Sequence, residues 1–518
     1  MWKSTAIQCL IGTFSLILAG SADANPTPKP DVSVATQTAQ AAPAMAATGE
    51  TRHISIVMVG DTGYAPHGFA PKPNGVAKHG RWLSWEQTTR HIAPHINGDI
   101  NFANMESVIS ANVRLRRVPK AFNFVTHPNG ARHLVNVGFN LFSMANNHSF
   151  DFGAQGIRDS VRHANELTRH GLLAHAGIGH DRWQAAHAPT FEVEGTKFAF
   201  GAIGIGASYG GPPRASTKRP GQLGINHNED VSLLMHNLKT AKADYRILSV
   251  HRGPERYIRT GAGEIKAIRS TMLKQGDVDL VIGHHAHVTR GVEINDGRLI
   301  LYGLGNFLHQ GTANMAGKGG CRDYSIIARA HLVADGHERP KLAALEIVPI
   351  TATHVQTRVM KPRAAAKRMA ILNGLAAQFD DDRHGAEGVR FSIRGDGTGL
   401  YCTAAAWDHA VTKSICLDYM PVQPSQLSTY RKALKSCGRS YQPLVAASRS
   451  EPAIRKSRRK AKAMVVAAAP ARPTQTPKKR AKLAKPSVEP AAAKAEIPVA
   501  SGKKKSTIMG FCGLISAA

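Results

Sequence analysis

The sequence predicts an α/β protein in which strands and helices alternate along the chain. Three observations support this fold class. Apolar runs of strand length recur between residues 53 and 302. Several of the stretches between them place apolar residues at helical spacing. Five of the runs end in polar side chains that can bind metals, as expected where the carboxyl ends of strands form a ligand crevice in an open α/β sheet.

The expected strands are seven apolar runs, and the run at 298–302 is expected to close the series. They comprise residues 53–59, 100–103, 139–144, 197–203, 246–250, 279–282 and 298–302. Helices are expected at residues 154–170, 231–243 and 264–275. The first of these places Ile157, Val161, Ala164 and Leu167 at spacings of four and three residues, which is one face of a helix.

The N-terminal residues 1–24 read as a secretory signal peptide. Lys3 supplies the positive charge, residues 6–19 are mostly apolar, and Ala22-Asp23-Ala24 fits a cleavage site. An uncleaved membrane anchor is disfavoured, because the apolar run is shorter than the ~20 residues that a spanning helix needs. We therefore expect a protein secreted across the inner membrane, periplasmic or associated with the cell envelope.

Composition divides the remainder of the chain into four parts. Residues 25–51, rich in Pro, Ala and Thr, are expected to form a flexible linker, and residues 52–361 the main domain. A small cysteine-containing extension is expected at 362–444, where two of Cys402, Cys416 and Cys437 could pair. Residues 445–518 contain few large apolar side chains and are expected to be a disordered tail.

The net charge of +30 is unevenly distributed, because residues 449–505 of that tail contain 17 Lys and Arg but 3 Asp and Glu, which gives +14 there and +16 in the rest of the chain. Such a charge attracts polyanions. The tail could bind an anionic envelope polymer or a membrane surface, or it could be a solvated spacer. Nucleic acid is disfavoured as a partner, because of the signal peptide and because few aromatic residues accompany the charge.

Candidate metal ligands follow five of the expected strands. Asp61 and Glu106 can supply anionic oxygens, whereas neutral ligands can come from Asn147, His251, His285 and His287. Each alone has a simpler explanation, such as a turn, a helix cap or a solvated loop. Both rings of the pair His285 and His287 can point inward if the backbone turns after the strand. Together, at successive strand ends, these residues predict a metal site.

These motifs resemble the CapA family of poly-γ-glutamate capsule synthesis proteins, which belong with the calcineurin-like metallophosphoesterases. The resemblance covers roughly residues 54–348. It is carried by Val59-Gly60-Asp61, Ala103-Asn104-Met105-Glu106-Ser107, Ala145-Asn146-Asn147-His148-Ser149-Phe150-Asp151-Phe152-Gly153, Ser249-Val250-His251-Arg252-Gly253-Pro254-Glu255, Val281-Ile282-Gly283-His284-His285-Ala286-His287-Val288 and Leu304-Gly305-Asn306-Phe307. It implies a four-layer α/β sandwich of metallophosphoesterase type, with two divalent metal ions (Mn, Fe or Zn) at the strand ends.

The resemblance also implies a role for each candidate residue. One metal would be bound by Asp61 and His287, the second by Asn147, His251 and His285, and Glu106 would bridge them. His148 would act in catalysis, Asp151 would orient its imidazole, and Glu255 would be a spare acid or a supporting partner. The chain departs from the wider pattern at Thr62-Gly63, where a His is usual, at Glu106, where an Asp is usual, and at Arg252, where related chains often have Trp.

A role in the synthesis or export of poly-γ-glutamate or a capsular polymer follows as the expected function. The chemistry would be metal-dependent hydrolysis of a phosphoester or a γ-glutamyl amide bond, and the partners an anionic polymer and export-complex proteins. Two alternatives remain open at this point. One is a non-catalytic envelope scaffold or anionic-polymer-binding protein of the same fold, and the other is an adaptor whose working part is the basic tail.

Overall fold

The structure is a computed structural model, which describes residues 51–64, 71–78, 81–205, 214–336 and 338–438. The expected signal peptide, all but the last residue of the expected linker, and the expected tail at 445–518 lie outside the described residues. Within the described ranges, no helix has both the length and the apolar character needed to cross a membrane.

The first of two large sheets contains the N-terminal strand at its centre. Within the described residues it has ten strands. Eight follow one another in the order β22 (Ser392–Ile393), β23 (Gly399–Cys402), β19 (Lys341–Thr351), β18 (Ser325–Ala334), β1 (Arg52–Gly63), β4 (Ile100–Met105), β7 (Leu141–Ser143) and β8 (Ala174–Ala176). The other two are β17 (Asn306–His309), which pairs with β1, and β20 (Arg358–Val359), which pairs with β19.

The second large sheet has seven strands within the described residues. Their order is β10 (Thr190–Val193), β11 (Thr196–Gly204), β13 (Tyr245–His251), β14 (Leu280–His284), β16 (Arg298–Leu301), β15 (Val292–Asn295) and β21 (Ala386–Gly388). The central strands β11, β13, β14 and β16 run parallel. Parallel strands are buried on both faces, and this explains why their sequences are almost continuously apolar.

The two sheets pack face to face. Alternate side chains of each strand point to opposite faces of its sheet, so every second side chain enters the space between the sheets. Ile56 and Met58 of β1 belong to the same buried cluster as Ile247 of β13 and Ile282 of β14. The intervening residue Val57 packs instead on the opposite face of its sheet. The main core therefore lies between the sheets.

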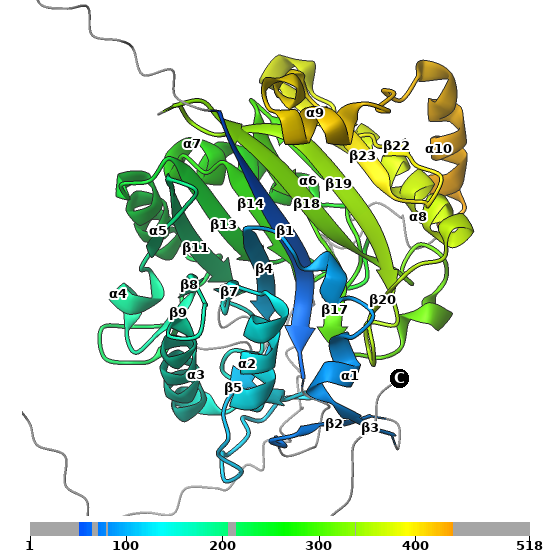
Figure 1. Cartoon of the computed structure of the whole chain (residues 1–518). Helices are drawn as coiled ribbons and strands as arrows, with labels where there is room; N and C mark the ends of the chain where they lie inside the picture. Colours follow the sequence, from blue (N-terminus) through cyan, green and yellow to red (C-terminus); the bar gives the residue numbers. More distant parts are fainter. Residues whose placement is uncertain (1–50, 65–70, 79–80, 206–213, 337, 439–518) are drawn as a thin grey trace, which may run out of the picture. The chain divides into compact units, whose positions relative to one another are not determined.

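Helices cover the two outer faces. On the first sheet lie α2 (Pro128–Val137) and α3 (Gly153–Thr168), whose residues Ile157, Val161, Ala164 and Leu167 are all buried as the spacing predicts. On the second sheet lie α5 (Asn228–Thr240), seen beside β11 in Figure 1, and a continuous helical segment made of α6 (Ala262–Ala267), a π-helical stretch (Ile268–Leu273) and α7 (Lys274–Gly276). The layers are helix, sheet, sheet and helix, so the predicted four-layer α/β sandwich is confirmed.

Smaller elements complete the described chain. Three two-stranded sheets are formed by β2 (Gly75–Lys78) with β3 (Arg81–Ser84), β5 (Val108–Ile109) with β6 (Val125–Thr126), and β9 (Ile178–Gly179) with β12 (Gly221–Gln222). The remaining α-helices are α1 (Trp85–Thr89), α4 (Arg182–Ala185), α8 (Pro362–Leu375), α9 (Ala410–Cys416) and α10 (Leu427–Lys435).

The expectation that the strand series closes at residues 298–302 is wrong. The two longest partners of the first sheet, β18 and β19, come later and pair antiparallel with each other, and β18 pairs with β1. Their sequences contain Ala and Leu, which also suit helices, and a short apolar run does not distinguish the two structures by itself. Pairing with β1 decides the strand conformation of β18, and pairing with β18 decides that of β19.

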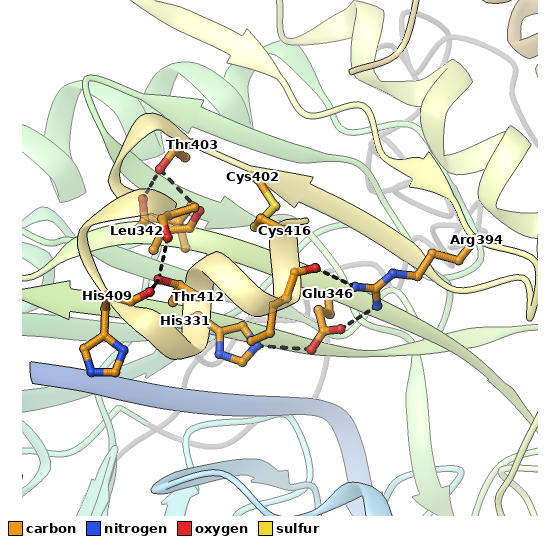
Figure 2. Close-up of a disulfide and its surroundings, with 12 residues drawn as sticks. His331, Leu342, Glu346, Arg394, Cys402, Thr403, His409, Thr412 and Cys416 are labelled. Carbon is orange, nitrogen blue, oxygen red and sulfur yellow. Dashed lines mark hydrogen bonds and ion pairs between the residues drawn. A yellow bond between two sulfur atoms is a disulfide. The ribbon is translucent and has the colours of Figure 1, made fainter. Parts of the chain in front are cut away.

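The segment after residue 361 is joined to the first sheet by pairing and by disulfides. Strand β23 pairs with β19, and Cys402 in β23 is bonded to Cys416 in α9. In Figure 2 this disulfide lies near Glu346 of β19, whose carboxylate is 3.1 Å from His331 Nε2 and 2.6 Å from Arg394 Nη1. Cys402 and Cys416 are one of the pairs left open by the sequence.

The third cysteine of the expected trio is bonded elsewhere. Cys437, just after α10, pairs with Cys321, 116 residues earlier in the chain. The end of the described chain is thereby fastened to the loop that precedes β18.

Candidate metal centre

The two sheets meet at the carboxyl ends of their parallel strands. Ser249 Oγ in β13 donates a hydrogen bond of 2.8 Å to Ser143 Oγ in β7, across the gap between the sheets. Two residues further along β13, His251 lies beside His284 of β14 in parallel register. The polar residues that follow these strands are thus brought to one edge of the sandwich.

Asp61 occupies the end of β1 and is completely buried. Its Oδ1 accepts a hydrogen bond of 2.8 Å from Asn104 Nδ2, and its Oδ2 lies 3.1 Å from His287 Nδ1. The preceding residue must be glycine, because a Cβ on Gly60 would lie 1.7 Å from the carbonyl oxygen of Gly305. This close approach positions Asp61, whose backbone N–H donates to the same carbonyl at 3.0 Å.

Glu106 follows β4 directly and is also completely buried. Its Oε1 lies 3.4 Å from His251 Nε2, and its Oε2 lies 2.9 Å from His309 Nε2. Neither carboxylate oxygen meets the geometry of a hydrogen bond with any described residue. A buried carboxylate without hydrogen bonds is costly unless a cation compensates it.

His285 and His287 reach the centre because the backbone turns after β14. Their φ angles are 85° and 55°, in the left-handed region that residues with a side chain seldom adopt. His285 Nδ1 lies 3.1 Å from His251 Nε2, which is itself 2.8 Å from Asn147 Oδ1. Backbone strain of this kind persists where the surroundings enforce it and is typical of functional sites.

The candidate ligands form two groups that share one carboxylate. Glu106, His251 and His285 form one group, and Asp61, Glu106 and His287 form the other, with the ligand atoms of each group within 4.8 Å of one another. Asp61 Oδ2 and both Glu106 oxygens are buried and lack hydrogen-bond partners among the described residues. Anionic oxygens and imidazole nitrogens in this arrangement fit divalent transition metals.

Electrostatics at the centre also favour a cation. Burial opposes ionisation of Glu106, but His287 and His309 outweigh this effect and hold the pKa of Glu106 well below its usual range. Burial likewise opposes a charge on His287, yet Glu106 and Asp61 raise its pKa to about 10. A proton on His287 thus balances the two carboxylates, and binding of a divalent ion would release it.

His148 and Asp151 lie beside these ligands in the turn between β7 and α3. His148 Nδ1 is 2.7 Å from Asp151 Oδ2, so the carboxylate accepts from Nδ1–H and leaves Nε2 as the other polar atom of the ring. Burial lowers the pKa of His148, and Asp151 offsets part of this effect. Lys120 Nζ donates to Asp151 Oδ1 at 2.6 Å and to the carbonyl of Asn147 at 2.8 Å.

One predicted site residue, Glu255, lies apart from the others. It is exposed and belongs to neither metal group, although its charge contributes to the raised pKa of His287. Two residues were missed in the sequence. His309 ends the four-residue strand β17. Its position two residues after the Leu304–Phe307 motif, at the end of a short apolar run, is the sequence signal that points to it. Lys120 follows no strand and has no comparable signal.

Comparison with known proteins agrees with the motifs. The family described as bacterial capsule synthesis protein PGA_cap matches residues 55–311, about half of the chain. This chain belongs to that family. The capsule biosynthesis protein CapA of Bacillus anthracis is 25% identical over 287 residues, which cover 54% of this chain and 63% of that protein, so less than two thirds of the relative is matched.

Other similar proteins extend the comparison to solved structures. The PGA biosynthesis protein CapA of Bacillus subtilis strain 168 is 24% identical over 54% of this chain and 70% of its own length. A hypothetical protein from Thermus thermophilus superposes with a TM-score of 0.32 and 16% identity, over 57% of this chain and 98% of its own. The NAD nucleotidase of Haemophilus influenzae has a TM-score of 0.32 and 10% identity, over 58% and 56%.

Proposed function

We propose that this member of the capsule synthesis family is a metal-dependent hydrolase that cleaves a phosphoester or γ-glutamyl amide bond during the synthesis or export of an anionic capsular polymer. One observation carries the proposal. Glu106 belongs to both candidate metal groups, and its two buried oxygens have no hydrogen-bond partner among the described residues. A carboxylate shared in this way suits a bridging ligand between two ions.

The ligand set divides between two ions of Mn, Fe or Zn. Asp61 and His287 would hold one, His251 and His285 with Asn147 the other, and Glu106 both. Such ions supply Lewis-acid polarisation of the scissile bond and charge stabilisation during its cleavage. Asp61, Glu106, His251 and His285 are buried, whereas Asn147 and His287 are partly exposed and leave the centre open to water and substrate.

The proton chemistry of the chain centres on His148. Its Nδ1–H is held by Asp151 at 2.7 Å, so Nε2 can take up a proton from the attacking water and pass it to the leaving group. Asp151 stabilises the imidazolium while Nε2 is protonated, and Lys120 holds the carboxylate in place. Replacing His148 with Ala should lower turnover by about 100-fold or more while the metal content stays unchanged.

The proposed location is the periplasm or cell envelope, after secretion across the inner membrane. The signal-like residues 1–24 support it, as do two disulfides, which persist in oxidising compartments. The names of the Bacillus relatives refer to capsule and PGA biosynthesis, and they support an anionic polymer as the partner. Export-complex proteins and a membrane surface, contacted through the tail, are further proposed partners.

The proposal is tested by metal analysis and hydrolysis assays on the same samples of full-length protein. Wild type is compared with Glu106→Gln and His285→Ala, and with Glu192→Gln, which changes an exposed glutamate of β10 as a matched control. A phosphodiester and a γ-glutamyl peptide serve as substrates. We expect both site variants to lose metal and activity together and the control to keep both. Bound metal without turnover on either substrate would contradict hydrolysis, and wild type that binds no metal would remove the site assignment.

A further inference from the structure

The segment between β5 and β6 is fastened to the candidate catalytic turn. The backbone N–H of Val118 donates to the carbonyl of Asp151 at 3.0 Å, and Asn123 Nδ2 donates to the same carbonyl at 3.1 Å. Lys120 reaches the Asp151 carboxylate from the inner side of this segment. Phe124, at its end, lies with its ring 4.2 Å from that of His148. The second half of the segment is therefore held beside the turn that contains His148 and Asp151. We call residues 111–122 the arginine loop.

The arginine loop has positive charge that nothing in the described structure neutralises. It contains Arg114, Arg116, Arg117 and Lys120 and no acidic residue. The three arginines are exposed, and within the described residues their side chains form no ion pair or hydrogen bond. Only Lys120 is paired, with Asp151.

Other arginines of the fold behave differently. Arg269 is 2.8 Å from Glu293, and the fully buried Arg290 lies 3.3 Å from Glu264. Those guanidinium groups hold the fold together. Three adjacent guanidinium groups without acidic partners, on a loop with fixed ends, instead create a positive potential that draws in anions, and each can bind a carboxylate through two parallel hydrogen bonds.

We infer that the arginine loop is a docking site for a polycarboxylate chain, such as a γ-linked glutamate polymer, and that it delivers this chain to the metal centre. Arg117 directly precedes Val118, whose backbone N–H donates a hydrogen bond to the carbonyl of Asp151. The Cα atoms of Arg117 and Val118 are about 3.8 Å apart. An anionic chain seated on the loop is thus close to His148 and the metal ligands. The inference deepens the proposed function and rests on it for the identity of the polymer.

Binding of a fluorescent γ-glutamate oligomer to the full-length protein, without added metal, tests this inference. The triple variant Arg114→Gln/Arg116→Gln/Arg117→Gln is compared with Lys361→Gln/Arg363→Gln/Lys367→Gln. The latter removes the same charge from exposed positions at the start of α8 that also lack ion pairs among the described residues. We expect the loop variant to bind about tenfold more weakly and with a smaller salt dependence, and the control to change by less than about twofold.

Crosslinking with a photoreactive oligomer distinguishes binding to the loop from binding to the basic tail, which is present in every variant. Crosslinks to residues 111–122 that disappear in the loop variant support the inference. Equal affinities of the two triple variants, with crosslinks confined to residues 445–518, would overturn it. Polyphosphate or single-stranded DNA that displaces the oligomer from the loop at lower concentration than unlabelled polyglutamate would overturn the choice of a polycarboxylate.

The outcome is independent of the metal assays. If the loop variant binds polymer normally while wild type holds metal and hydrolyses its substrate, the inference of a docking site is wrong and the proposed hydrolase is unaffected. If polymer binding depends on the loop but the protein takes up no metal, the docking site is supported and the proposed hydrolase function is rejected.

Discussion

His309 Nε2 lies 2.9 Å from Glu106 Oε2, and both side chains are completely buried. His309 reaches this position because the short strand β17 runs parallel to β1 and ends at the same edge of the sheet. The pair does not meet the geometry of a hydrogen bond, but so close a contact limits how far the carboxylate that the two metal groups share can turn. His309 therefore supports the centre without belonging to either group.

Replacing His309 with Gln should weaken metal binding by about 10- to 100-fold, the usual cost of losing a partner that orients a ligand. Titration with Mn²⁺ followed by metal analysis measures the change. His331→Gln serves as the control and should leave metal affinity unchanged, because this buried histidine of β18 pairs with Ser55, six residues before Asp61 on β1. Equal losses in both variants would show that the effect is general destabilisation.

Gly60 should not tolerate even one added methyl group. The Cβ of Gly60→Ala would lie 1.7 Å from the backbone oxygen of Gly305, so the backbone of β1 must move. We expect a loss of stability of about 1–3 kcal/mol or more and loss of the metal, because Asp61 moves with the strand. Gly263→Ala, in α6, meets no atom within 4 Å and should change stability by less than about 1 kcal/mol. Urea unfolding of both variants, together with metal analysis, provides the comparison.

The two disulfides should contribute unequally to stability. Cys321 and Cys437 are separated by 116 residues, and Cys402 and Cys416 by 14. In the chain-entropy account a bond that closes a longer loop restricts the unfolded chain more, by about 4.7 kcal/mol for 100 residues against about 3 for 15. Replacing both cysteines of the long-range pair with Ser should therefore lower the urea midpoint more than replacing the short-range pair. A larger effect of the short-range pair would contradict this ranking.

His53 should make the fold less stable in mild acid. Burial and the neighbouring His331 and His409 lower its pKa from 6.5 to about 4, so the folded protein resists protonation that the unfolded chain accepts. Stability from this group is therefore present above pH 6.5 and is lost as the pH falls from 6.5 towards 4, by at most about 1.4 kcal/mol per pH unit for one proton. Urea unfolding between pH 7 and 5 should show a smaller acid loss for His53→Asn than for wild type. Parallel curves for the two proteins would rule out His53 as the source.

Much of the fold and of the centre could be predicted because its determinants are local. The apolar runs that became β1, β4, β11, β13 and β14 are buried and nearly continuous, and helix α3 has an apolar face with regular spacing. Candidate ligands such as Asp61, Glu106 and His251 stand at or directly after strand ends, so their positions in the sequence indicate the edge at which they gather. The later strands β18 and β19 were not predicted, because their runs mix Ala and Leu with Ile and Val, and a short apolar run of this kind does not by itself separate strand from helix.

The sequence by itself thus determined the α/β class, the strand ends with their metal ligands, and the uneven distribution of positive charge, because these depend on residue order and on local periodicity. Only the tertiary structure decided which side chains from distant segments meet. It brought His309 to Glu106, Lys120 to Asp151 and Cys321 to Cys437. It also fastened the second half of the arginine loop to Asp151, the partner of His148. The physical reason is that such pairings follow from how strands align and how loops return across the sheets, and these are properties of packing between segments far apart in the chain.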